Sequence, residues 1–166
     1  LIGSNEQSLV AMRDAVAPGW AARIVSDRMV GDVAEAAAQI ARAAREAPPD
    51  RPTALIFGGE TTVTLRGSGK GGRNQELALR VAQEMRGWSG DWVFLSGGTD
   101  GRDGPTDAAG GIVDGGTLAR IAASGHEMQA LLANNDSNAA LAAAGDLLET
   151  GATGTNVADV QVMLLN

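Results

Sequence analysis

The chain has 166 residues and a net charge of −7 at pH 7, from 13 basic and 20 acidic side chains. An acidic chain lacks the basic face that a general nucleic-acid binder needs, so we expect no nucleic-acid partner. The absence of cysteine excludes disulfides and thiolate metal sites, and a single histidine excludes a histidine-rich metal site. No apolar run approaches the roughly 18 residues of a membrane span, so we expect no membrane partner and a cytoplasmic protein.

Residues 1–50 form a first predicted segment with a strand–helix–strand–helix pattern. The expected strands are residues 1–3 and 22–25, and the expected helices are residues 5–17 and 32–47. Asp32 and Glu35 have the spacing of a capping box at the start of the second helix. Because the chain begins with leucine rather than methionine, we expect it to be a fragment or the ordered part of a longer chain.

Residues 51–166 form the second predicted unit, in which strands and helices alternate. The expected strands are residues 54–57, 92–95, 112–113 and 156–165, with a further extended run at 61–66. The expected helices are residues 73–85, one capped by Asp114 that ends near Gly125, and one that begins near Ser137. Short apolar strands between helices predict an α/β fold with three α/β/α layers and a mixed, largely parallel sheet.

A glycine-rich stretch from Gly67 to Gly72 comes directly before the predicted helix that begins at Arg73. Glycines allow main-chain N–H groups to approach an anion, and a helix N-terminus adds about half a positive charge. Lys70 and Arg73 add formal charge at the same place, so the stretch is either an anion site or a flexible loop tip with solvated basic side chains.

The same stretch also fits the G-x-G-x-x-G spacing of dinucleotide-binding proteins, with glycines at positions 67, 69 and 72. That motif needs an acidic residue at the end of the next strand, about 20 residues further on. Asp91 comes before the next strand and Asp100 lies too far along, so this interpretation is weak. The stretch has no Gly-Lys-Ser/Thr ending and is therefore not a Walker loop.

Two further loops carry polar side chains. The long loop from Ser96 to Gly111 contains three aspartates, Asp100, Asp103 and Asp107, which are able to hold Mg²⁺, accept a proton or cap turns. It follows the carboxyl end of a strand, where open α/β sheets place their ligands. Residues 150–156 form a small polar turn that either lines a ligand or merely connects two elements.

Four motifs together resemble the C-terminal module of the glycerate 2-kinase family, which is called the MOFRL domain. They are Gly-Gly-Glu-Thr-Thr-Val at 58–63, Gly-Gly-Arg-Asn-Gln-Glu at 71–76, the Gly/Asp loop at 98–110 and Thr-Gly-Thr-Asn at 153–156. The resemblance runs from about Phe57 to Leu165 and implies the C-terminal part of a two-domain kinase. The family's N-terminal portion, with a functional lysine, has no counterpart here. Members are often labelled hydroxypyruvate reductase.

The resemblance implies that D-glycerate is phosphorylated at its 2-hydroxyl by ATP with Mg²⁺, giving 2-phosphoglycerate and ADP in a cleft between two domains. The functional arginine of the family falls on Arg73. We expect Arg73 and Lys70 to meet a carboxylate or phosphate, and Asp103 or Asp100 to orient Mg²⁺ or the attacking hydroxyl, with Glu60 as a third candidate. Further candidates for binding substrate or phosphate are Gly71, Gly72, Asn74, Thr61, Thr99, Thr155 and Asn156.

The expected partners are glycerate, ATP, the N-terminal portion of the same polypeptide and a second copy in a homodimer. Without that N-terminal portion we expect the chain to be inactive. Two alternatives stay open. One is an NAD(P)H-dependent hydroxypyruvate reductase, based on the glycine spacing, and the other is a non-catalytic module that binds small anions.

Overall fold

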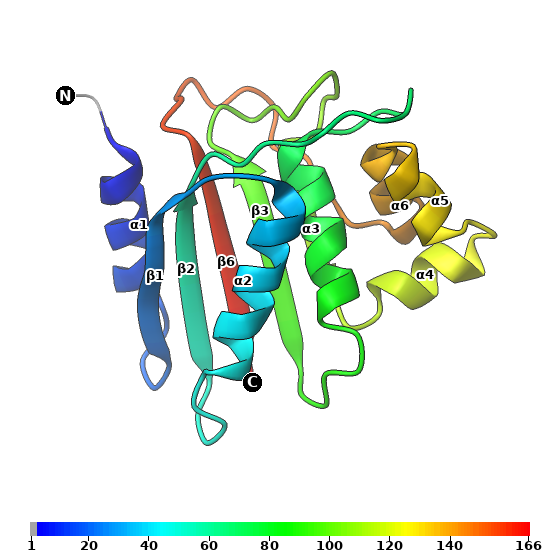
Figure 1. Ribbon diagram of the computed structural model, residues 1–166. Coiled ribbons are helices and arrows are strands. Elements are labelled where there is room, and N and C mark those ends of the chain that lie inside the picture. Colours follow the sequence, from blue (N-terminus) through cyan, green and yellow to red (C-terminus); the bar gives the residue numbers. More distant parts are fainter. Residues whose placement is uncertain (1–2) are drawn as a thin grey trace.

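The computed structural model describes residues 3–166, which form one six-stranded sheet with helices packed against it (Figure 1). The strands are β1 (Ala21–Met29), β2 (Thr53–Gly59), β3 (Trp92–Gly98), β4 (Gly110–Asp114), β5 (Leu147–Leu148) and β6 (Asp159–Leu165). Their order across the sheet is β1-β2-β6-β3-β4-β5, so the C-terminal strand lies in the middle. The α/β class and the mixed sheet are as predicted.

The prediction that the sheet is largely parallel is wrong. Only β1 and β2 pair in parallel, and the other four pairings are antiparallel. The reason is twofold. The last strand, β6, inserts between β2 and β3 and runs against both, while the loop after β3 returns the chain as an antiparallel neighbour, with no crossover helix. Strand direction depends on these connections, which an apolar strand pattern does not record.

Six helices complete the described residues: α1 (Asn5–Asp14), α2 (Val33–Arg45), α3 (Arg73–Glu84), α4 (Thr117–Ala123), α5 (Met128–Ala133) and α6 (Ser137–Ala144). Helices α2 and α3 lie side by side on one face of the sheet, and α1 packs on β1 and β2 (Figure 1). Helices α4, α5 and α6 cluster beside α3. In residues 3–166, no helix has both the length and the apolar character needed to cross a bilayer.

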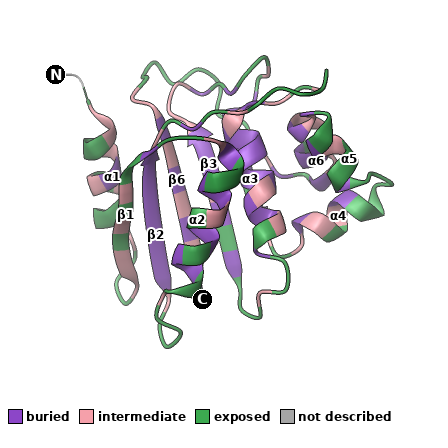
Figure 2. Cartoon of the chain, viewed as in Figure 1, coloured by how far each residue is buried: buried purple, intermediate pink, exposed green. Residues whose placement is uncertain are grey.

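The main core lies between the sheet and the two helices α2 and α3 (Figure 2). Phe57 and Phe94 project from the strands and are fully buried against Ile40 and Leu77 of the helices. Alanines along the buried stripe of α2 allow this helix to approach its neighbours closely. Asp32 caps α2 by accepting a hydrogen bond from the Ala34 N–H at 2.8 Å, which confirms the predicted helix start.

The opposite face of the sheet is less well covered. Val93 and Ile112 remain 40% and 38% exposed there, and Val162 and Leu164 are half-buried. An open apolar groove of about 430 Å³ runs along this face, with walls from α1 and from strands β2 and β6. Helices therefore lie on both faces of the sheet, as the three-layer prediction requires, but the two outer layers are unequal.

Several local expectations need correction. Residues 61–66 do not form a strand and contribute only an isolated bridge between Asp32 and Thr62. Ser4, not Asn5, caps the first helix. Helix α5 and strand β5 were not expected, because six and two residues are too short to show a clear periodicity. The strand expected at residues 1–3 falls mostly outside the described residues.

Candidate functional site

The candidate site lies at one edge of the sheet, where β2 and β3 end and β6 begins. The register places Asp159, the first residue of β6, between Gly59 and Gly98 on its two neighbours. Helix α3 begins above this point with Arg73. Two strand ends, a strand start and a helix start therefore meet at one place.

Arg73 is held in this position by a two-pronged ion pair. Its Nε and Nη2 atoms donate to the two carboxylate oxygens of Asp159 at 2.6 and 3.0 Å. Asp159 is 1% exposed, whereas the side chain of Arg73 is 35% exposed. The hydrogen bonds that Arg73 donates to Asp159, together with the attraction of nearby carboxylates, raise the pKa of Arg73 against the effect of burial. One edge of a fixed, charged guanidinium thus faces outward.

Glu60 lies on the open side of that guanidinium. Its Oε1 atom is 3.1 Å from Nη1 of Arg73, and its side chain is 59% exposed. An exposed ion pair of this kind contributes about 1 kcal/mol or less. The contact is therefore weak enough for another carboxylate or a phosphate to replace Glu60 at Nη1.

Asp103 lies beside Arg73, buried at the start of α3 and 3% exposed. Its carboxylate accepts hydrogen bonds from the Asn74 N–H at 3.1 Å and the Gln75 N–H at 2.8 Å, and from the Gln75 side-chain amide at 3.0 Å. Burial raises the pKa of Asp103, although these hydrogen bonds favour its ionised form. Asp103 caps the helix from a distant loop, which was one of the roles that the sequence left open.

The glycine-rich loop and the aspartate loop therefore meet at one edge of the sheet, where Gly72 lies against Asp103 and Gly104 against Gly71. The meeting differs from the expectation in one respect. The N–H groups of Asn74 and Gln75, which have no partner within α3, donate to Asp103 and are therefore not available to a ligand. Because Asp103 already fills the anion position of this helix end, anion binding rests on the side chain of Arg73.

The glycine-rich loop packs against the turn between α5 and α6. Main-chain N–H groups of residues 66–70 donate to residues 134–136, including Arg66 to the Asn135 side chain at 2.6 Å and Lys70 to that of Asp136 at 3.1 Å. These five main-chain N–H groups are already bonded within the fold, so they are not available to cradle a phosphate. A side chain at Gly67 or Gly69 would collide with the same turn, which explains the glycines.

Of the remaining predicted residues, some are buried in the fold and others are exposed to solvent. Asn74 is buried and its side-chain oxygen accepts from Ser96 Oγ at 2.6 Å. Thr61 is buried, and its hydroxyl has no hydrogen-bond partner in residues 3–166. Thr99 Oγ1 donates to the Ala158 carbonyl at 2.7 Å and so fastens the aspartate loop to the segment before β6.

Lys70, Thr155 and Asn156 have exposed side chains, and the main chain of Lys70 bonds to Asp136 and Asn138 at the start of α6. Gly71 and Gly72 lie in the tight approach to α3, where a side chain would strike Ser137 and Asp103 respectively.

Asp100 and Asp103 differ in their fitness for Mg²⁺. Both oxygens of Asp103 are occupied by hydrogen bonds, so it does not fit. Asp100 is half-exposed and uses only Oδ1, which accepts from the Arg102 N–H at 3.0 Å. No cluster of three or more metal-ligating acidic or histidine side chains occurs in residues 3–166. Mg²⁺ often binds to one carboxylate together with substrate phosphates, and Asp100 fits that mode.

Sequence reasoning missed Asp159, the main partner of Arg73. The available signal was an acidic residue at the very start of an apolar strand, directly after a polar turn. In the interior of a sheet such a residue needs a cationic partner, because a buried unpaired carboxylate is costly.

Comparison with known proteins decides the family of the chain. Residues 53–159 match the MOFRL family model. The chain belongs to the MOFRL family. The match contains Glu60, Arg73 and Asp103, and it ends at Asp159, so the whole ion-pair site lies within the MOFRL segment.

The relatives of this MOFRL chain are named as glycerate kinases. It is 48% identical to a D-glycerate 2-kinase of Thermotoga maritima over 89% of this chain and 36% of the relative. It is 40% identical to the human glycerate kinase over 99% of this chain and 41% of the relative. The crystal structure of the Thermotoga maritima glycerate kinase matches with a TM-score of 0.93 and 44% identity, over 100% of this chain and 41% of that one. The chain thus spans well under half the length of these relatives.

Proposed function

We propose that this chain is the MOFRL part of an ATP-dependent glycerate 2-kinase, which transfers the γ-phosphate of ATP to the 2-hydroxyl of D-glycerate. The observation that carries the proposal is the Arg73 guanidinium, fixed by buried Asp159 with one edge open at the sheet edge. The names of the relatives support the same reaction.

Arg73 has the properties that phosphoryl transfer requires of a protein group. Such a transfer needs positioned charge more than covalent chemistry. Because Asp159 holds Arg73 from behind, the guanidinium is oriented before any ligand arrives. In this proposal the glycerate carboxylate or the transferring phosphate takes the place of Glu60 at Nη1. Lys70, exposed on the neighbouring loop, adds positive charge at the approach.

Asp103 acts in this proposal as a positioning residue. By capping α3 at Asn74 and Gln75, it fixes the residues that follow Arg73 in the helix. Asp100 is the carboxylate that would hold Mg²⁺ together with the phosphates of ATP. When bound, the metal would neutralise charge on those phosphates. Thr99 fixes the loop that carries Asp100. Thr155 and Asn156 lie on the neighbouring turn, which is joined to this loop by a hydrogen bond from the Thr153 N–H to the Asp100 carbonyl.

The relatives are more than twice as long as this chain, and we propose that the rest of the enzyme corresponds to their additional residues. We propose that an N-terminal portion forms the second wall of the cleft and supplies the family's lysine, so that residues 1–166 alone do not turn over. Location in the cytoplasm and assembly as a homodimer belong to the same proposal.

The structure offers less support for a reductase. The G-x-G-x-x-G interpretation needs a strand that leads directly into the glycine turn. Strand β2 ends at Gly59, eight residues before Gly67, and the N–H groups of residues 66–70 are already bonded to residues 134–136. A dinucleotide pyrophosphate would therefore find neither the expected turn nor its free donors.

A direct assay on the purified intact enzyme tests the proposal. ATP, Mg²⁺ and D-glycerate are supplied, and 2-phosphoglycerate and ADP are followed by ³¹P NMR, so that no coupling enzyme intervenes. Glycerate-dependent appearance of both products supports the kinase. Oxidation of NADH or NADPH by hydroxypyruvate, without phosphate transfer from ATP, would instead show that the enzyme is a reductase. Binding of glycerate without either reaction would favour the anion-binding module.

A further inference from the structure

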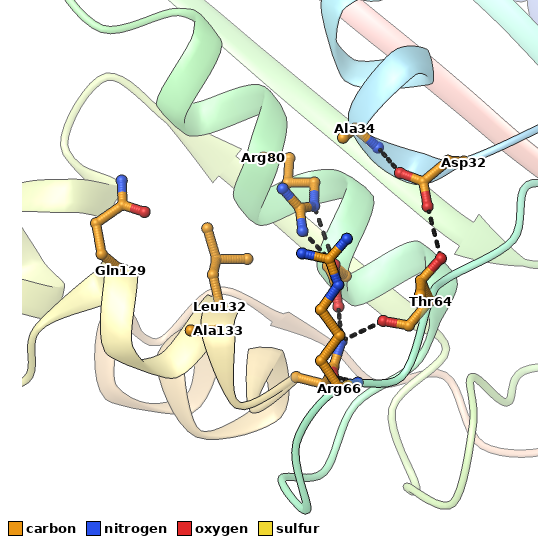
Figure 3. Close-up of a pocket in the computed structure, with 10 residues that line it drawn as sticks. Asp32, Ala34, Thr64, Arg66, Arg80, Gln129, Leu132 and Ala133 are labelled. Atoms are coloured by element: carbon orange, nitrogen blue, oxygen red, sulfur yellow. Dashed lines mark hydrogen bonds and ion pairs between the residues drawn. The ribbon is translucent and has the colours of Figure 1, made fainter.

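A polar pocket whose lining does not include Arg73 lies beside the residues that precede the glycine-rich loop. It encloses about 280 Å³ between the start of α2, residues 64–66, the middle of α3 and helix α5 (Figure 3). Its lining residues are Asp32, Ala34, Thr64, Arg66, Glu76, Arg80, Gln129, Leu132, Ala133 and Asn135. None of these residues was among the candidates from the sequence, and the proposed reaction does not use them.

Two arginine side chains point into this pocket (Figure 3). Arg80 is bonded through Nε and Nη2 to a single oxygen of Glu76, at 3.0 and 2.7 Å, so its Nη1 atom has no bond to that carboxylate. Arg66 is exposed and forms no ion pair with any residue in 3–166. Two like charges thus face the same space, an arrangement that an anion between them would stabilise.

The acidic residues of the pocket are already bonded. Glu76 is 2% exposed, and its second oxygen accepts from the Asn135 side chain at 3.1 Å. Asp32 caps α2 through one oxygen and accepts from the Thr64 hydroxyl at 3.2 Å through the other. Among residues 3–166, Arg66 is therefore the basic lining residue that no carboxylate pairs, whereas Arg80 is paired with Glu76.

The wall that carries Arg66 is held rigidly. Asn135 has a φ of 54°, in the left-handed region that asparagine adopts more readily than other non-glycine residues. In that conformation its side chain accepts from the main-chain N–H groups of Arg66 and Gly67, at 2.6 and 3.0 Å, and donates to the Thr64 carbonyl at 3.2 Å. These three hydrogen bonds fix the main chain of residues 64–67 at the edge of the pocket.

We propose that this pocket is a second anion site, in which Arg66 and Arg80 bind one phosphate group. A phosphate offers oxygens to both guanidinium groups at once, and Arg side chains match that geometry well. The site is separate from that of Arg73, because Arg73 and Arg80 are seven residues apart on α3, or about 10 Å along its axis. The ligand class is a free phosphate or a small phosphate monoester. The proposal does not depend on the kinase activity.

Titration of the intact protein with inorganic phosphate, followed by calorimetry, tests the proposal. The titration starts from an Arg73→Ala variant, so that the first site does not contribute. We expect this variant to retain one phosphate site and the further change Arg66→Ala to weaken it about tenfold or more, the loss expected for a hydrogen-bonded charge. Arg66→Lys keeps the positive charge but not the paired donors of the guanidinium, so its phosphate affinity should lie between that of the Arg73→Ala variant and that of the variant that also carries Arg66→Ala.

Arg23→Ala provides the matched control, since Arg23 is an exposed arginine on β1 outside the pocket. Thermal unfolding of each variant without phosphate checks that it is folded. Unchanged phosphate binding after Arg66→Ala, or an equal loss after Arg23→Ala, would overturn the proposal. Repeating the titration with 2-phosphoglycolate identifies the source of the phosphate, because tighter binding than that of inorganic phosphate indicates a monoester site and equal or weaker binding indicates free phosphate.

Discussion

At the residue scale, the site depends on one arginine with unequal partners. Asp159 is buried and binds Arg73 through two hydrogen bonds, whereas Glu60 is exposed and touches it through one. The buried partner fixes the direction of the guanidinium, because removing a buried ion-pair partner is far more costly than removing an exposed one. The exposed partner occupies the position that we assign to the substrate anion.

Replacing Arg73 by lysine should therefore reduce turnover steeply. Lysine retains the charge but does not form the two-pronged contact with Asp159, so the charge loses its fixed direction. We expect kcat of the intact enzyme with D-glycerate and ATP to fall about a hundredfold, the usual effect of losing one oriented transition-state contact. Arg23→Lys, on β1, should leave kcat unchanged. Near-normal turnover by Arg73→Lys would remove the oriented guanidinium from the mechanism.

Asp103 allows a test of capping without any substrate. Changing Asp103 to alanine leaves the N–H groups of Asn74 and Gln75 buried and unpaired. Loss of a helix cap costs about 1–2 kcal/mol, so we expect a drop of that size in the free energy of unfolding, measured by urea denaturation in Mg²⁺-free buffer. Asp107→Ala, at an exposed position of the same loop, should change it little. Equal effects of the two changes would contradict the capping role.

Sequence alone could predict that Arg73 begins a helix, but not which residues surround it. The arginine followed from its motif and from the helix that begins there, both of which are local features. Its partner Asp159 lies 86 positions away, and Asp103 reaches the same helix start from 29 positions away. Which distant carboxylate fills which position depends on the register of β6 between β2 and β3, and no local pattern records that register.

At the element scale, the glycines before α3 follow from packing. A side chain at Gly72 would collide with the Asp103 carboxylate, so we expect Gly72→Ala to displace the cap of α3. Overpacking of this kind costs about 1–3 kcal/mol of unfolding free energy. Gly115→Ala is the control, because its nearest neighbour would lie at an ordinary 3.6 Å. Thermal or urea unfolding of the two variants measures the difference, and equal stability would contradict the tight approach.

Arg120 joins three elements and carries a prediction about pH. It donates to Asp114 at the end of β4 at 3.0 Å and to Asp146 before β5 at 2.7 Å. Burial opposes ionisation of Asp114, but hydrogen bonds from Arg120 and from main-chain N–H groups outweigh it and lower the pKa of Asp114 below its ordinary 3.8. The resulting stabilisation is fully present above pH 3.8 and is lost as the pH falls through the lowered value.

We therefore expect Arg120→Met to reduce the free energy of unfolding at pH 7 by about 1–3 kcal/mol, because it leaves the buried Asp146 carboxylate without its cation. The gap between the wild type and the variant should narrow below pH 3.8. Urea denaturation from pH 3 to 7 measures both quantities. A gap that widens on acidification would show that the pKa of Asp114 is not lowered by this contact.

The elements that could be predicted are those with strong local signals. Helices α2 and α3 have caps or glycine boundaries and clear apolar stripes, and both begin close to the expected residue. Helix α5 has six residues and β5 has two, which is too short for a periodic pattern. Residues 61–66 read as extended, but their main-chain groups bond to the α2 start and to Asn135, so they form a loop.

At the scale of the whole molecule, the sheet is organised around its last strand. Strand β6 pairs with β2 on one side and β3 on the other over its full length, so the C-terminus completes the centre of the sheet. Strand β1 lies at one edge and has register irregularities between Ile24 and Met29. Strand β5 forms the other edge and pairs at only two positions. Local opening should therefore begin at both edges.

Native-state hydrogen exchange measures this order. We expect the amides of β2, β6 and β3 to exchange only through global unfolding, because they are hydrogen-bonded on both sides and lie over the main core. Amides of β5, and of β1 beyond Ile24, should exchange at least about tenfold faster through local opening. Low concentrations of urea should accelerate exchange in the central strands more than at the edges, since global unfolding exposes more surface. Equal protection of β1 and β6 would mean that the sheet opens as one unit and that the central position of the last strand adds no stability of its own.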